Sequence, residues 1–167
     1  MKQSGRGLKR RLSLIGNRLS RAKHYRGYGV HSPFVYGLIR KVFMCKHLFE
    51  EQASGLFDAL LACGVPAKRA IQLQNTLHHC ECKAYSINAV EGDFALFTAD
   101  YPAEQLREQY EKAKARGAIF VVLSPYLNRE RQNEVKALVA EHCSTTVDNR
   151  AYILFFNNHL PKQYYRL

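Results

Sequence analysis

Two adjacent histidines followed by a Cys-x-Cys form the densest group of potential metal ligands in the sequence. The stretch HHCEC supplies His78, His79, Cys80 and Cys82, and cysteine thiolates and neutral imidazoles are good zinc ligands. Four ligands within five consecutive residues cannot easily surround one tetrahedral ion, and structural zinc sites usually draw on two separated clusters. We therefore predict no metal site, and we interpret the segment as a connecting turn whose cysteines are small apolar fillers.

The remaining reactive side chains do not form a recognisable catalytic arrangement. Seven histidines are scattered along the chain, and their spacing identifies no Ser-His-Asp or Cys-His group. Asp100 follows a predicted strand and could act as a general base. A capping role in the helix opened by Pro102 is the favoured interpretation. The sequence therefore predicts no catalytic residue.

The positive charge of the chain is concentrated near its N-terminus. Residues 1–49 hold 12 of the 25 Lys and Arg and no acidic residue, whereas the rest of the chain holds 13 basic and 14 acidic residues. Apolar residues recur at helical spacing over 8–19, which predicts a basic amphipathic helix. The arginines on its other faces are Arg10, Arg11, Arg18 and Arg21. We favour a helix docked on the domain by its apolar stripe; contact of these arginines with nucleic acid, or binding to an anionic membrane surface, is the alternative.

The composition limits the class of protein. With 167 residues, 47% of them hydrophobic, we predict one globular domain over 1–167, in which a basic helical segment (1–49) precedes an α/β core (50–167). The longest apolar run, 118–123, is far shorter than the roughly 20 residues that cross a bilayer, so no transmembrane segment is expected. Five cysteines without framework-like spacing favour reduced thiols and a cytoplasmic protein.

Apolar periodicity predicts N-terminal helices followed by an α/β layer. Ser32 and Pro33 favour a helix start, and a further helix is expected over 51–63. Short apolar runs then alternate with helices over 103–117 and 128–142. The predicted strands cover 70–74, 84–88, 94–98, 118–123, 144–149 and 151–156. Strands without alternation are typical of a parallel sheet covered on both faces, so we expect a mostly parallel sheet that ends in an antiparallel strand pair.

Residues 29–34 read GVHSPF, and the chain ends in LFFNNHLPKQYYRL. In these segments the chain resembles bacterial class I S-adenosylmethionine-dependent methyltransferase-like proteins, in which a G-x-H-S-P-F motif opens an N-terminal helix. The likeness covers both ends and much of the middle. It implies a Rossmann-like sheet whose first strand runs into an E-x-G-x-x-x-G turn beside the cofactor, where a side chain would block close approach of the backbone.

The residues that match the cofactor positions of the family depart from its pattern. Gln72, Gln74 and His78 stand at the positions of the acid and the two glycines. Asn75 lies in the same turn, and Asn88 stands where the next strand ends in a ribose-binding acid. The resemblance therefore makes these five residues the cofactor-facing positions, and it implies that binding of S-adenosylmethionine is lost.

The strand spacing points to a shortened member of the family. Nine residues (75–83) separate the first two predicted strands and five (89–93) the next two, whereas a parallel crossover needs about a dozen. We favour a degenerate protein without cofactor binding that acts as a binding or scaffold protein. The alternatives are an active methyltransferase that uses S-adenosylmethionine in an atypical pocket, and a nucleic-acid-binding module. A shortened sheet with uncovered faces or edges is also compatible with a homodimer.

Overall fold

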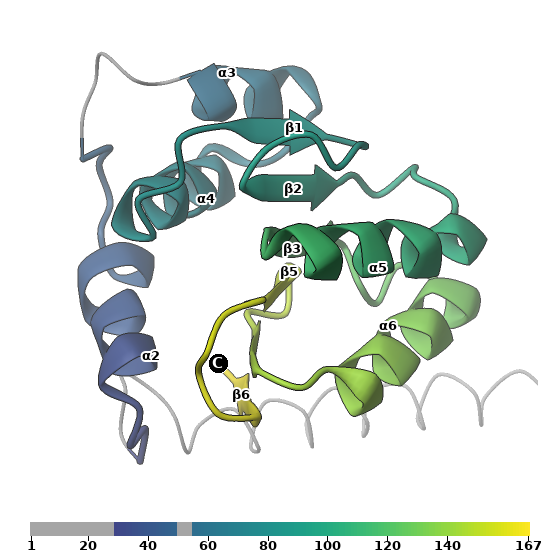
Figure 1. Cartoon of the computed structure of the whole chain (residues 1–167). Helices are drawn as coiled ribbons and strands as arrows, with labels where there is room; N and C mark the ends of the chain where they lie inside the picture. The colour runs from purple at the N-terminus through teal and green to yellow at the C-terminus, as the bar shows by residue number, and fades with distance from the viewer. Residues whose placement is uncertain (1–28, 50–54) are drawn as a thin grey trace, which may run out of the picture.

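The computed structural model describes residues 29–49 and 55–167 (Figure 1). A mixed sheet of six strands runs through this part in the order β1-β2-β3-β5-β4-β6. The strands are β1 (Tyr85–Ile87), β2 (Phe94–Phe97), β3 (Ile119–Leu123), β4 (Thr145–Asp148), β5 (Tyr152–Phe155) and β6 (Gln163–Arg166). The pairs β1/β2, β2/β3 and β4/β6 are parallel, and β5 is antiparallel to both β3 and β4. The α/β class and the antiparallel pair over 144–156 are thus confirmed, whereas β6 has no counterpart among the predicted strands.

Helices cover both faces of the sheet. One face carries α2 (Pro33–Gly37), its π-helical continuation η2 (Leu38–Phe43), α3 (Gly55–Ala62) and α4 (Ala67–His79). The other carries the 3-10 turn η4 (Ala103–Gln105), α5 (Leu106–Arg116) and α6 (Arg129–Glu141). Figure 1 shows α4 and α5 on opposite sides of the strands. Within the described residues, no helix is long and apolar enough to cross a membrane.

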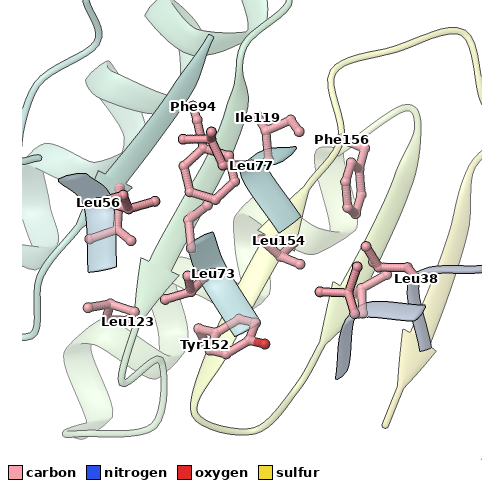
Figure 2. Close-up of a cluster of buried hydrophobic side chains, with 14 of the residues drawn as sticks. Leu38, Leu56, Leu73, Leu77, Phe94, Ile119, Leu123, Tyr152, Leu154 and Phe156 are labelled. Carbon is pink, nitrogen blue, oxygen red and sulfur yellow. The ribbon is translucent and has the colours of Figure 1, made fainter. Parts of the chain in front are cut away.

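Two hydrophobic clusters explain why the strands read as continuous apolar runs. Phe94 and Leu96 of β2 join the cluster under α2, α3 and α4, part of which is drawn in Figure 2. Ala95 and Phe97 of the same strand join the cluster under α5 and α6. Because successive side chains of a strand point to opposite faces, strands such as β2 and β3, which these clusters cover on both faces, are apolar at every position.

The start of α2 agrees with the sequence prediction. Ser32 is the N-cap residue, and its Oγ accepts a hydrogen bond of 3.3 Å from the amide of Val35. Pro33 occupies the first turn, where its missing N–H costs nothing. The ring centroids of Phe34 and Phe156 lie 5.0 Å apart in an edge-to-face contact, so the two segments that carry the family resemblance meet in space.

Helix α4 is the clearest departure from the sequence prediction. It contains residues 70–74, so the strand predicted there is wrong. The alternation of AIQLQ is typical of a strand, but Ala, Lys, Arg, Gln and Leu all favour a helix. Ala70, Leu73 and Leu77 recur at helical spacing and are buried in the core cluster, whereas the polar residues between them conceal this period because they are buried as well.

The connection from β1 to β2 is very short for a parallel pair. It comprises residues 88–93, all of them described, and contains no helix, which confirms the prediction for this gap. The amides of Asp93 and Phe94 donate to the carbonyl of Ala84 at 3.0 and 3.2 Å. A Cβ at Gly92 would lie 2.5 Å from that same oxygen. Only glycine therefore allows the chain to return so directly.

Candidate functional site

The carboxyl ends of the parallel strands open into a cavity of about 870 Å³. Asn88, Thr98 and Ser124 directly follow β1, β2 and β3, and all three line it. Because β5 is antiparallel to β3, it begins at the same edge, where Arg150 and Tyr152 form another wall. The loop between α3 and α4 completes the lining. Open α/β sheets bind ligands outside the carboxyl ends of their strands, so this cavity is the candidate functional site.

Three residues that line the cavity have a left-handed backbone. Asn88, Ser124 and Arg150 have φ angles of 58°, 47° and 57°. Among the described residues only one further non-glycine residue, Glu81, shares this conformation. Asparagine tolerates such a backbone, but for Ser124 and Arg150 it costs about 1–2 kcal/mol per residue and persists only where the surroundings enforce it. Strained positions of this kind gather at ligand sites, which agrees with the position of the cavity in the sheet.

Hydrogen bonds fix the loops that follow β1 and β2 to each other. The Oδ1 atom of Asn88 accepts from both the amide and the hydroxyl of Thr98, each at 2.9 Å. The backbone N–H of Asn88 donates to the carbonyl of Leu96 at 2.7 Å. The side-chain oxygen of Asn88 thus helps to hold the two loops that form this wall of the cavity. Of the five predicted cofactor positions, it is the one that the structure brings to the cavity.

A buried arginine fixes the loops that follow β2 and β3. Arg131, in the first turn of α6, is only 1% exposed. Its guanidinium donates to the carbonyls of Thr98 (2.6 Å), Tyr101 (2.8 Å) and Leu123 (3.1 Å). Burial lowers the pKa of Arg131 and the nearby Asp100 carboxylate opposes this effect, but a guanidinium remains charged in proteins. The wall of the cavity is therefore held by charge-assisted hydrogen bonds to the backbone.

Positive charge predominates among the side chains that line the cavity. Lys68 and Arg69 come from the first turn of α4, Arg150 comes from the turn before β5, and Asp100 is the one carboxylate in the lining. The Thr98 side chain holds the pKa of Asp100 below its ordinary value, so Asp100 is ionised at neutral pH and is a weak general base. The other lining side chains are mostly apolar, among them Val65, Pro66, Leu123, Leu127 and Ala151.

The other predicted cofactor residues lie on α4 and outside the cavity lining. Three of them, Gln72, Gln74 and Asn75, are at most 3% exposed and bind the backbone of neighbouring segments. The bonds are Gln72 Nε2 to the Phe43 carbonyl (2.8 Å), the Phe57 amide to Gln74 Oε1 (3.0 Å), the Phe49 amide to Asn75 Oδ1 (3.0 Å) and Asn75 Nδ2 to the His47 carbonyl (2.9 Å). These side chains join α4 to the ends of η2 and α3, so they form no turn after a strand.

The HHCEC segment is the end of α4 and the turn that follows it. His78 and His79 lie in the last turn, and Cys80 is the C-cap residue. Burial raises the pKa of Cys80 to about 12 and that of Cys82 to about 11, so both thiols are protonated at neutral pH and are weak nucleophiles. Over 29–49 and 55–167, no group of three or more His, Cys, Asp or Glu side chains could hold a metal ion.

The chain was compared with family models, curated proteins and solved structures. None of them matches it. The function of the cavity must therefore be inferred from the residues that line it.

Sequence reasoning missed Arg131, which looks like one of several solvated charges in the run NRERQ. One signal was available. Arg131 precedes Val135 and Leu138 by four and seven residues, and therefore shares the buried stripe of its helix. A basic residue on such a stripe must find partners in the interior, because a buried charge without hydrogen bonds is very costly. The loops after β2 and β3 provide these partners.

Proposed function

We propose that this chain is a degenerate relative of the S-adenosylmethionine-dependent methyltransferase-like proteins, one that has lost cofactor binding and acts as a binding protein. The observation that carries the proposal is the direct return of the chain from β1 to the adjacent parallel strand β2. In the family that the GVHSPF motif indicates, the first strand leads into a glycine-rich turn and a helix. Here the residues matched to that strand and turn lie in α4, and β1, the first strand that the structure describes, is followed only by the connection 88–93.

The short connection removes the usual binding element for the cofactor. A glycine-rich turn works because it presents free backbone N–H groups at a helix N-terminus to the charged part of the ligand. In the 88–93 connection, the amides of Asn88 and Asp93 are already bonded to the carbonyls of Leu96 and Ala84. Gly92 serves close packing against Ala84, so this glycine does not provide room for a ligand.

The cavity favours ligand binding over a purely structural role. Its volume of about 870 Å³ falls within the range of roughly 300–1,000 Å³ that is typical of small-molecule sites. Apolar walls with a few polar groups are also typical of such sites. The clamp formed by Arg131 keeps the loops in place around this space. Ser124 and Arg150 keep a strained backbone at the edge of this cavity, and strain of this kind is typical of ligand sites.

Calorimetric titration with S-adenosylmethionine and S-adenosylhomocysteine tests the loss of cofactor binding. We expect no saturable heat with either compound for protein that unfolds cooperatively on heating. Binding with a micromolar Kd would overturn the proposal. It would favour an active methyltransferase with an atypical pocket.

A further inference from the structure

We propose that the cavity at the carboxyl ends of β1, β2 and β3 binds a small amphipathic monoanion, in which a flat apolar body carries one acidic group. The inference rests on the proposed function in that it assigns the cavity to a ligand other than S-adenosylmethionine. Three features support it: an excess of positive charge on one side of the cavity, apolar walls around the rest, and one carboxylate that limits the charge of the ligand.

The positive charge gathers where the loop after α3 meets α4. Lys68 and Arg69 stand in the first turn of this helix, whose start has neither an acidic residue nor a side-chain cap. Acidic residues are favoured at such a position because the helix dipole is positive there, so two cations at this point are electrostatically unfavourable without an anion. Arg150 adds a third cation. Three cations and one carboxylate leave the lining with an excess of two positive charges.

Two of these cations are free to serve a ligand. Lys68 and Arg150 are exposed, and the backbone of Arg150 is held in place by a 2.7 Å hydrogen bond from its amide to Asp148 Oδ1. Arg69 differs from them in that its side chain already has a protein partner: its Nη1 donates to Gln72 Oε1 at 2.8 Å. Arg69 therefore both supports the wall and adds charge to it. Lys68 and Arg150 are the residues to change in a test, since their removal breaks no side-chain hydrogen bond described in the structure.

The rest of the cavity suits an apolar body. Leu127 is 60% exposed, which is unusual for so large an apolar side chain next to a cavity. Together with Val65, Leu123 and Ala151 it offers apolar surface to a ligand. Covering such a surface removes it from water and favours binding. A ligand that consisted of an acidic group alone would leave these apolar side chains exposed to water, so the ligand needs an apolar part.

Asp100 sets the limit on the charge of the ligand. It lines the same cavity, and its lowered pKa keeps it ionised at neutral pH. A second or third acidic group on the ligand would approach this carboxylate and be repelled. A ligand with one carboxylate or sulfonate can therefore bind near Lys68 and Arg150 without placing a second acidic group against Asp100.

A pair of dyes that differ in one charge tests the proposal on the full chain. The probe is 8-anilinonaphthalene-1-sulfonate, a flat aromatic monoanion, and N-phenyl-1-naphthylamine has the same rings without the sulfonate. We expect saturable binding of the sulfonate dye to one site, detected by fluorescence. In the Lys68→Gln/Arg150→Gln double variant, its Kd should rise about fivefold or more, because two partly screened charge interactions are lost. The Kd of the neutral dye should change less than about twofold.

Control variants separate the site from general dye binding. Lys114→Gln removes an exposed charge of α5, outside the cavity lining, and should bind both dyes like the parent. Leu127→Ser should weaken both dyes, because it removes apolar wall. Every variant must first melt cooperatively near the parental temperature, since dyes of this type also bind loosened proteins.

Two results would overturn the proposal. One is a folded parent that shows no saturable binding of the sulfonate dye. The other is a double variant that binds this dye as tightly as the parent or the Lys114→Gln control. Displacement of the bound dye by S-adenosylmethionine is a separate outcome: it would contradict the proposed loss of cofactor binding, whereas the preference of the site for an anion is decided by the double variant.

Discussion

The Nη2 atom of Arg131 lies 2.6 Å from the carbonyl oxygen of Thr98, and the same nitrogen lies 3.1 Å from the carbonyl oxygen of Leu123. One buried guanidinium thus joins the ends of two neighbouring strands at the edge where the cavity opens. The bond to Tyr101 extends the clamp to the loop beyond Thr98. The shape of the candidate site therefore depends on a residue that does not line it.

Replacement of this arginine should destabilise the whole chain. In Arg131→Met, the carbonyls of Thr98, Tyr101 and Leu123 lose the hydrogen bonds from the guanidinium, and each buried acceptor left without a donor costs about 1–3 kcal/mol. The carbonyl of Thr98 keeps a bond of 3.3 Å from the amide of Tyr101. Because water from the cavity can replace part of this loss, we expect the free energy of unfolding to fall by about 2–4 kcal/mol, measured by urea denaturation. Arg129→Met is the matched control: Arg129 is exposed in the same helical turn, and its replacement should change stability by less than about 0.5 kcal/mol. Equal effects of the two substitutions would contradict the clamp.

Two glycines should respond to alanine in opposite directions. In Gly92→Ala the new Cβ meets the Ala84 carbonyl oxygen at 2.5 Å, so the β1–β2 connection must open, and we expect a loss of about 2 kcal/mol or more. In Gly37→Ala the new Cβ lies 3.8 Å from His79 Nε2, an ordinary contact within a helix, where alanine is favoured over glycine by about 0.5–1 kcal/mol. Thermal melting should show a lower Tm for the first variant and a higher one for the second. A Gly92→Ala variant as stable as the parent would contradict the close packing of Gly92 against Ala84 in the β1–β2 connection.

Acid should weaken the fold through His142. This residue is 2% exposed, and its Nδ1 lies 2.8 Å from the hydroxyl of Tyr110. Burial lowers the pKa of His142 from its ordinary value of 6.5, an effect that the backbone groups of Phe156 and Thr145 partly oppose. Below about pH 6.5, His142 is protonated in the unfolded chain but remains neutral in the native state. The free energy of unfolding therefore decreases as the pH falls below this value, by up to about 1.4 kcal/mol per pH unit.

The test compares the free energy of unfolding at several pH values between about 5 and 7.5. His142→Asn keeps an oxygen acceptor near Tyr110 and removes the titrating group, so its stability should depend less on pH than that of the parent. A residual slope is expected from His79, whose pKa is also lowered by burial and by Lys41. His159→Asn, at an exposed position, should keep the parental slope. If the stability of His142→Asn depends on pH as strongly as that of the parent, the assignment of the acid sensitivity to His142 is wrong.

The basic N-terminal stretch leads to a prediction about nucleic acid. Arg10, Arg11, Arg18 and Arg21 lie outside the described residues, so their role stays a prediction from the sequence. If they contact phosphates, the affinity for a labelled single-stranded RNA should fall steeply as the salt concentration rises. Replacement of all four by glutamine should abolish this binding, as should removal of residues 1–26, whereas Lys114→Gln should not. Fluorescence anisotropy at several salt concentrations measures the effect, and unchanged affinity of the four-arginine variant would count against the contact.

Much of the sheet could be predicted from the sequence because its strands are buried on both faces. The run AIFVVL appears as β3, and the segment TTVD followed by YILF appears as the antiparallel pair β4 and β5. The runs of β3 and β5 are apolar or aromatic throughout, so local pattern and tertiary environment agree there. In β4 the polar residues Thr145, Thr146 and Asp148 are buried as well. The strand predicted at AIQLQ is wrong for the opposite reason. Gln72 and Gln74 are polar and yet buried, which a pattern of apolar residues cannot distinguish from the exposed face of a strand.

The sequence by itself determined the α/β class, the helix start at Ser32 and Pro33, the order of the strands and helices from β1 to β5, and the absence of a crossover helix between β1 and β2. These features depend on local periodicity, helix capping and the number of residues between elements, all of which are properties of short stretches of sequence. Only the tertiary structure decided that Arg131 clamps the strand ends, that Asn88 reaches the cavity and that Gln72, Gln74 and Asn75 bind backbone groups of other segments. Each of these roles requires partners far along the chain, and the identity of a polar residue does not reveal which distant carbonyl or amide will satisfy it once water is excluded.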